Sequence, residues 1–382
     1  MPVRAHLLQR AVFARLSARI VIASLFAIGC VRPVSVQFPV AAANAVFPGA
    51  SWESVSDVRR AGWSPAGLDS VRAKLATLPS TGFMAISGGR VLMSYGNVDT
   101  VTYIASIRKS VLSMIMGNYV RRGTIDLNRT LAQLGMDDIG GLSAEEKEAT
   151  VKDLLTARSG VYHGASNPGD DLASAPPRGS QKHGTYQLYS NWDFNAVGAA
   201  FELMTKRNIY DALETDIARP IGMQDFDRRA QLKTGDTTRS RYPAYHMLFS
   251  TRDMARIGYL MLRRGNWNGR QLIPSDWVDE STRAFTPVTQ MNPPARRTGP
   301  FGYGYLWWVW DGPRATGAYM GAYTGLGAIG QHITVLPALD LVVAHKTAPG
   351  QVDAGGKPRT VSHPVYLEVL DLLVRAHCGA HC

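Results

Sequence analysis

The chain has 382 residues, of which 45% are hydrophobic and 19% charged; this is the composition of a globular protein with a sizeable core, which excludes a disordered or collagen-like chain. The net charge of +11 raises the question of nucleic-acid partners, but Lys and Arg are scattered and no basic helix or zinc-finger spacing occurs, so we expect no nucleic-acid binding. Residues 31–377 contain no cysteine, which argues against a cysteine nucleophile.

The N-terminal segment has the features of an export signal. Four arginines precede the apolar run 20–28, which is too short to span a bilayer but has the length of a signal-peptide core. The run ends in a small residue followed by Cys30, similar to a bacterial lipoprotein cleavage site; cleavage after Ala45 is the alternative. We expect residues 1–45 to be an export signal and linker, and the mature protein to be periplasmic or anchored to a membrane by a lipid on Cys30.

The pattern of the rest of the chain predicts an α+β fold. Sheet-forming segments lie near both ends and helices lie between them, so we expect one antiparallel sheet flanked by N- and C-terminal helices, with an all-helical region inserted. The corresponding domains are 46–105 plus 300–382 for the sheet and 106–299 for the mainly helical part. The expected elements in chain order are a helix at 65–77, a hairpin at 82–87 and 90–95, helices at 106–119 and 143–157, an irregular loop at 164–187, helices at 192–206, 209–217 and 251–264, strands at 331–336 and 341–346, and a helix at 362–376.

The first chemistry-bearing motif is Ser106-Ile107-Arg108-Lys109, the only Ser-x-x-Lys in the chain. Residues three apart share one face of a helix, so the Lys109 amine can reach the Ser106 hydroxyl. A serine nucleophile needs a base, and a lysine acts as one only when burial or a nearby cation lowers its pKa. The alternative is a solvated lysine on a helix surface, but this motif opens a strongly apolar helix.

Two further elements follow. Tyr189-Ser190-Asn191 comes after the irregular loop; the Tyr189 hydroxyl could shuttle protons, with a pKa lowered by a neighbouring ammonium, and Asn191 could orient Lys109 or a substrate carbonyl. Their alternatives are a core aromatic and a helix cap. The glycine-rich run 321–331 precedes a strand, and a backbone N–H there could form an oxyanion hole with that of Ser106; the alternative is a plain turn.

In this order the three elements resemble the serine β-lactamase and penicillin-binding superfamily, whose motifs begin with Ser-x-x-Lys. The Tyr-x-Asn motif is similar to that of class C β-lactamases and their esterase and 6-aminohexanoate-dimer hydrolase relatives. The resemblance extends over about residues 60–375 and implies that Ser106 is the acylated nucleophile, Lys109 its activator and Tyr189 the general base and then acid, with Asn191 in the second motif. The resemblance also implies that a backbone N–H of the third motif is an oxyanion donor. Leu326, Ala328 and Gln331 are the candidates for this donor, and we select Ala328.

The third motif departs from the family pattern, because Tyr323-Thr324-Gly325 carries no cation. In the family that cation helps to bind the carboxylate of β-lactams and peptide C-termini, so the resemblance implies an esterase or small amidase. The alternatives are a penicillin-binding or sensor protein that is acylated without turnover, and a class C-like β-lactamase. We expect no metal and no cofactor, since the chain has neither His-Glu-x-x-His nor zinc-ligand spacing.

Overall fold

The computed structural model describes residues 45–382. The predicted export signal, with its apolar run and Cys30, therefore lies outside the described residues. Between residues 45 and 382, no helix is both long and apolar enough to cross a membrane.

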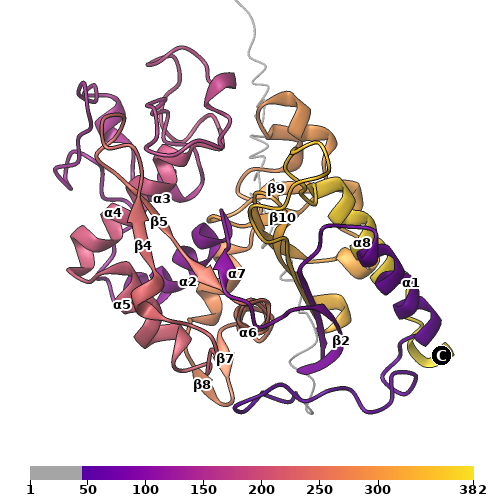
Figure 1. The fold of residues 1–382 in the computed structure, drawn as a ribbon. Helices are drawn as coiled ribbons and strands as arrows, with labels where there is room; N and C mark the ends of the chain where they lie inside the picture. The colour runs from indigo at the N-terminus through magenta and orange to yellow at the C-terminus, as the bar shows by residue number, and fades with distance from the viewer. Residues whose placement is uncertain (1–44) are drawn as a thin grey trace, which may run out of the picture. The chain divides into compact units, whose positions relative to one another are not determined.

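A seven-stranded antiparallel sheet is the centre of the structure (Figure 1). Strands from both ends of the chain form it, because the N-terminal hairpin pairs with the last strand, β1 against β13. The strand order is β2-β1-β13-β12-β11-β10-β9, with bounds Arg90–Gly96, Gly82–Ser87, Leu341–Lys346, Gln331–Leu336, Tyr323–Gly327, Trp308–Trp310 and Phe301–Tyr303. This confirms the predicted α+β architecture.

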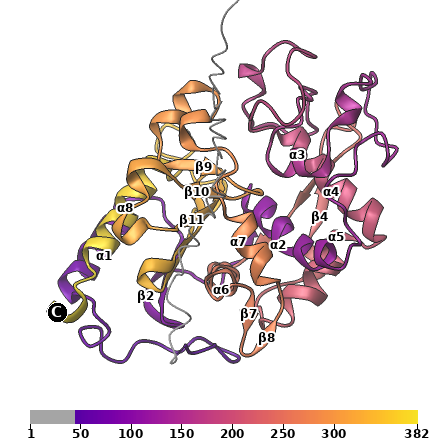
Figure 2. The same ribbon diagram turned by 180° about the vertical axis from the view of Figure 1, so that it is seen from behind.

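Helices cover both faces of this sheet. Along β12, Ile333 faces α6 (Thr251–Leu262), where it lies close to Gly258. The neighbouring residue His332 faces the other way and stacks on Tyr366 of α8 (His363–Arg375). Because successive strand residues point to opposite faces, α6 and α8 lie on opposite sides of the sheet, and α1 (Pro65–Ala76) packs beside α8 (Figures 1 and 2).

The remaining helices gather on the side of α6 away from the sheet (Figure 2). Their bounds are Ile107–Arg121 for α2, Val151–Leu155 for α3, Asn191–Thr205 for α4, Ile209–Leu213 for α5 and Ser275–Ser281 for α7. Helix α2 contacts β11 as well as α4, α5 and α7, so it lies at the junction between sheet and helices. Residues 45–382 belong to one compact unit, and the boundaries proposed for separate sheet and helical domains stay predictions.

Most predicted elements are present, with two corrections. The hairpin turns at Gly88 and Gly89, whose φ angles are +58° and +88°. The single helix expected at 143–157 is wrong: the segment holds a 3-10 turn and the short α3, because Thr150 is extended and caps α3 in a capping box with Asp153. Helix α8 begins at His363, one residue after its expected start, and the hydroxyl of the preceding Ser362 makes no capping bond.

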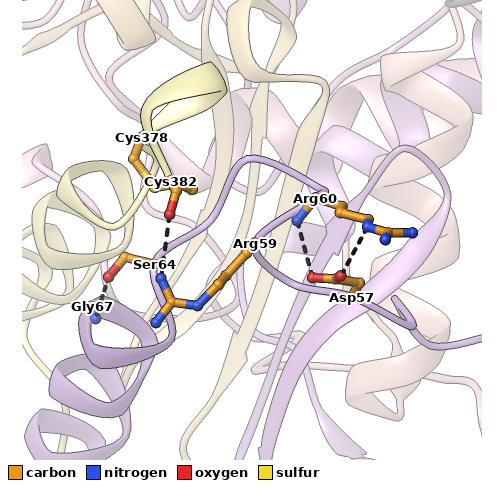
Figure 3. The surroundings of a disulfide bond; sticks show 7 residues. All are labelled: Asp57, Arg59, Arg60, Ser64, Gly67, Cys378 and Cys382. Atoms are coloured by element: carbon orange, nitrogen blue, oxygen red, sulfur yellow. Dashed lines mark hydrogen bonds and ion pairs between the residues drawn. A yellow bond between two sulfur atoms is a disulfide. The ribbon is translucent and has the colours of Figure 1, made fainter.

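A disulfide between Cys378 and Cys382 closes the C-terminal segment. The segment is fixed to the N-terminal part of the fold, since the backbone N–H of Cys378 donates to Gly62 at 3.0 Å. Arg59 Nη1 donates to the Cys382 carbonyl at 3.3 Å (Figure 3). These contacts hold the end of the chain against the turn that leads into α1.

Three histidines gather where the sheet packs against α8: His332 and His345 on the strands are buried, and His363, the first residue of α8, is half-buried. The His332 ring stacks on Tyr366 with centroids 3.7 Å apart and faces His363 at 3.4 Å. His345 is held between the Gly330 carbonyl at 2.7 Å and the Ser80 hydroxyl at 2.8 Å. Burial lowers the pKa of His345 and of His363 to about 4, and lowers that of His332 well below its usual range. All three are therefore neutral in the folded protein at neutral pH.

This cluster predicts a fold that loses stability in mild acid. The unfolded histidines bind protons near pH 6.5 while the folded ones do not, so the free energy of unfolding should fall as the pH drops from about 6.5 to 4. Each proton contributes a slope of up to about 1.4 kcal/mol per pH unit. Urea unfolding at several pH values should show a flatter dependence for His332→Phe, which keeps the aromatic stack. The exposed His381→Gln is the control, and equal slopes in all three proteins would contradict the prediction.

Candidate active site

Ser106 lies at the N-terminus of α2, and its hydroxyl is not used to stabilise that helix. It occupies the N-cap position, but its side chain makes no capping hydrogen bond. The preceding residue, Ala105, is buried and has φ +51°, a left-handed conformation that costs a non-glycine residue free energy and is commonest at functional sites. Ser106 itself is only partly buried, whereas Lys109, Tyr189 and Asn191 are buried.

The Lys109 amine lies one turn along α2 and points at three oxygens. Nζ is 3.0 Å from Ser106 Oγ, 2.6 Å from the Tyr189 hydroxyl and 2.7 Å from Asn191 Oδ1. Lys109 is only 1% exposed. The structure therefore brings together all four residues of the first two predicted motifs, around one buried nitrogen.

The protonation state of Lys109 follows from its surroundings. Burial holds its pKa well below the usual range and the charge of Arg108 lowers it further, while Asp170 and Asp171 act in the opposite direction. A neutral amine has two N–H donors and one lone pair. Asn191 Oδ1 can only accept, so one hydroxyl, of Ser106 or Tyr189, is free to donate its proton to that lone pair.

Tyr189 ends the irregular loop and is packed between aromatic rings. Its ring centroid lies 4.7 Å from that of Phe194 and 5.4 Å from that of Trp308. Burial raises its pKa to about 12, although a hydrogen bond with Ser106 and the charges of Arg108 and Arg296 act against the rise. The expectation that a neighbouring ammonium lowers this pKa is therefore wrong, because desolvation of the phenolate outweighs the nearby cations.

Asn191 is the first residue of α4, and Ser190, rather than Asn191, caps that helix. The Asn191 amide nitrogen donates to the Pro168 carbonyl at 2.8 Å, which fixes Oδ1 towards Lys109. The Asn191 backbone N–H donates to Asp170 Oδ2 at 3.0 Å. The irregular loop thus sets the orientation of the second motif.

Strand β11 runs beside the start of α2, and its glycines permit the approach. A Cβ atom on Gly327 would lie 2.6 Å from the Ile104 carbonyl and 3.1 Å from the Ala105 Cβ, distances that no larger residue tolerates. Ala328 follows at the exposed turn. Within residues 45–382, the N–H groups of Ser106 and Ala328 donate to no backbone or side-chain oxygen. Of the other two donor candidates, Leu326 lies within β11 and pairs with His332, while Gln331 starts β12.

Comparison with known proteins identifies the family. A model of the Beta-lactamase family matches residues 69–348. The chain belongs to the Beta-lactamase family. The resemblance inferred from the sequence motifs is thereby confirmed.

Solved structures share the fold of this Beta-lactamase family chain at low sequence identity. A protein assigned as a 6-aminohexanoate-dimer hydrolase from Bacillus anthracis has a TM-score of 0.60 at 18% identity, over 85% of this chain and 87% of that one. A penicillin-binding protein homolog from Caulobacter crescentus gives 0.55 at 14%, over 82% and 99%. EstCE1, described as a hydrolase with promiscuous acyltransferase activity, gives 0.58 at 13%, over 81% and 97%.

The structure adds residues that the motifs did not indicate. Arg296 forms a two-point ion pair with Asp171, at 2.6 and 2.8 Å, and its guanidinium lies 5.7 Å from the Tyr189 ring and 5.1 Å from that of Trp308. This pair joins the irregular loop to the 3-10 turn Pro294–Thr298 beside the Tyr189 ring. Its partners are 125 positions apart, so no local pattern could show the contact. Within residues 45–382, no group of three or more His, Cys, Asp or Glu side chains could hold a metal ion.

Asp138 is a carboxylate that helps to hold α4, the helix that begins with Asn191, in place. Its carboxylate accepts from the Trp192 indole at 2.6 Å, the Ser240 hydroxyl at 2.5 Å and the backbone N–H groups of Arg241 and Ile139, both at 2.7 Å. Asp138 is 1% exposed. Burial raises its pKa, but the hydrogen bonds outweigh burial and the net pKa is lowered. One carboxylate therefore ties two other segments, the loop at 138–139 and residues 240–241, to the helix that begins with Asn191.

Asp138→Ala should destabilise the protein by about 3–5 kcal/mol, because it leaves several buried donors without an acceptor. Asp138→Asn keeps the shape and half of the acceptor capacity, so a smaller loss is expected. Urea unfolding monitored by circular dichroism measures both. The exposed Asp69→Ala on α1 is the control; a loss for Asp138→Ala no larger than for this control would show that the network contributes nothing.

Proposed function

We propose that this protein is a serine hydrolase that cleaves small esters or amides through an acyl-enzyme on Ser106. The observation that carries the proposal is the buried Lys109 amine, which lies 3.0 Å from Ser106 Oγ and 2.6 Å from the Tyr189 hydroxyl. Burial and the charge of Arg108 lower the pKa of Lys109 and so favour its uncharged form, and an uncharged amine beside a serine is the base that the nucleophile requires.

Acylation follows from these positions. Ser106 Oγ attacks the substrate carbonyl carbon, and its proton passes to Lys109 Nζ, directly or through the Tyr189 hydroxyl. The carbonyl oxygen becomes an oxyanion, for which the N–H groups of Ser106 and Ala328 are the proposed donors. The carbon–oxygen or carbon–nitrogen bond then breaks, and the leaving group takes the proton back from the Lys109–Tyr189 pair.

Deacylation uses the same groups in reverse order. Water attacks the ester carbonyl on Ser106 and gives its proton to the Lys109–Tyr189 pair. The ester bond to Ser106 Oγ breaks, and the serine recovers its proton while the carboxylic acid leaves. Asn191 takes no proton in either half; its role is to hold Lys109 in place through Oδ1.

The proposed substrate class rests on the residues of the third motif. Strand β11 carries Tyr323-Thr324-Gly325 and offers no cation to a substrate carboxylate. This favours esters and small amides over β-lactams. The non-turnover penicillin-binding protein and the class C-like β-lactamase are separate outcomes of the test.

Labelling and turnover test the proposal together. Purified protein is treated with a fluorophosphonate, and peptide mapping locates the adduct, which we expect on Ser106. Steady hydrolysis of p-nitrophenyl butyrate with little hydrolysis of nitrocefin supports the esterase. A single stoichiometric burst would indicate acylation without turnover, and efficient nitrocefin hydrolysis would indicate a β-lactamase. An adduct on any other serine would refute the assignment.

We also propose that the protein is exported, with a lipid on Cys30. The Cys378–Cys382 disulfide supports this location, since such bonds persist in oxidising compartments. Expression in a bacterium fed a labelled fatty acid should label the wild type but not Cys30→Ser. Equal labelling of both proteins would overturn the lipid anchor.

A further inference from the structure

Arg108 is a fully buried cation beside the proposed base. It is the second residue of α2 and is 1% exposed. Its Nη2 donates to Asn195 Oδ1 at 3.0 Å, and its guanidinium lies 4.3 Å from the centroid of the Tyr245 ring. Its Nη1 is buried without any hydrogen-bond partner. Among residues 45–382 it forms no ion pair.

The two other buried arginines of the described chain have more polar partners than Arg108, although the Nε atom of each is also buried without a hydrogen-bond partner. Arg263 pairs with the carboxylate of Asp340 at 2.6 Å. Arg256 donates to the carbonyls of Ile221 at 2.7 Å and Gly49 at 2.8 Å. Arg108 has only one amide oxygen and one aromatic face. Burying a charge with so few partners is costly, so its position calls for a functional explanation.

The charged and titratable groups around Lys109 come from three elements. Arg108 lies on α2 itself, Asp170 and Asp171 lie on the irregular loop, and Tyr189 precedes α4. The two carboxylates favour a protonated Lys109 and Arg108 opposes it. Arg108 also acts on Tyr189, together with Arg296.

The charge of Arg108 also affects the pKa of groups other than Lys109 and Tyr189. Burial, with Arg108 as the second cause, lowers the pKa of His246 to about 4. Burial raises the pKa of Tyr245 and of Tyr210, and Arg108 opposes both rises. None of these groups is a carboxylate, so none of them provides a counter-ion for the guanidinium.

We propose that Arg108, held without a counter-ion beside Lys109, is a positioning residue that keeps the amine of the resting enzyme unprotonated and so available as the base. This inference rests on the proposed function. Arg108 touches no reacting atom; it acts through Lys109 by its charge alone. The acidic side chains of the irregular loop would otherwise draw a proton onto the amine.

A purely structural role is the competing explanation. Asn195, which accepts from Arg108, also donates to Asn167 Oδ1 at 2.8 Å. The neighbouring Pro168 carbonyl holds Asn191, so Arg108 is part of a chain of contacts that orients the second motif. Two variants separate the roles: Arg108→Gln keeps a donor for Asn195 and removes the charge, whereas Arg108→Lys keeps the charge.

The readout is the pH dependence of kcat/KM for p-nitrophenyl butyrate, whose acid limb reports the proton that the coupled Lys109–Tyr189 pair must lose. For Arg108→Gln we expect this limb to move to higher pH by about one unit, because the repulsion that disfavoured the ammonium is gone. For Arg108→Lys we expect a limb within about 0.3 units of the wild type, since the charge is kept.

Equal losses of activity in both variants with unmoved acid limbs would overturn the proposal and leave a structural role. Thermal melting identifies a variant that is unfolded at the assay temperature. The pH dependence of kcat/KM for such a variant is then measured at a lower temperature, beside the wild type at the same temperature. Failure of the proposed function is a separate result, because it shows as an unlabelled Ser106 in the wild type itself.

Discussion

Replacing Ser106 with alanine is expected to lower kcat for p-nitrophenyl butyrate by about 10⁴-fold or more and to abolish fluorophosphonate labelling. The substitution removes the oxygen that we propose carries the acyl group, and enzymes that lose their nucleophile retain only a small residual rate. Because Ser106 makes no capping bond, the fold should be unaffected. Activity is measured by p-nitrophenol release, labelling by mass spectrometry of the intact protein, and stability by thermal melting.

Ser113 provides the matched control for this variant. It lies on the same helix, is fully buried, and its hydroxyl has no hydrogen-bond partner. Ser113→Ala therefore removes a serine from α2 without removing an interaction, and activity within about two-fold of wild type is expected. If Ser106→Ala still turns over the ester at a rate near that of Ser113→Ala, the nucleophile lies elsewhere.

The elements that could be predicted from the sequence are those with a strong local signal. The hairpin 82–96 and the strands at 331–336 and 341–346 are short segments rich in apolar residues and bounded by turn residues, and the structure has strands at the same positions. The short strands β9, β10 and β11 were not predicted, because their sequences are rich in Gly and aromatic residues and only pairing within the sheet makes them strands.

The residues of the candidate site also divide into those that a local sequence signal predicts and those that it does not. The contact between Ser106 and Lys109 follows from helical spacing alone. Tyr189 joins them across 80 positions, and only the order of the motifs in a known family indicated it. The burial of Arg108, inside the very motif that was singled out, depends on Asn195 and Tyr245 far along the chain. The raised pKa of Tyr189 likewise depends on burial, which no local pattern reports.

Replacing Lys109 with methionine is expected to lower kcat/KM for the same ester by about 10³- to 10⁴-fold, the scale of a lost general base. Methionine fills a similar volume but accepts no proton, so Ser106 keeps its hydroxyl hydrogen at neutral pH. Stability should change little, because the relief from burying an amine offsets the lost contacts to Tyr189 and Asn191. The exposed Lys357→Met on a C-terminal loop is the control, and its activity should match wild type.

The double variant Ser106→Ala/Lys109→Met makes this prediction sharper. Residues that act as one unit show non-additive losses, so once the serine is gone the lysine has nothing to activate. The double variant should therefore turn over at the residual rate of Ser106→Ala alone, within about three-fold. If the two losses instead multiplied, Lys109 would act on a step that does not involve Ser106. The 3.0 Å contact between Nζ and Oγ would then be structural, and the base of the reaction would have to be sought at Tyr189 alone.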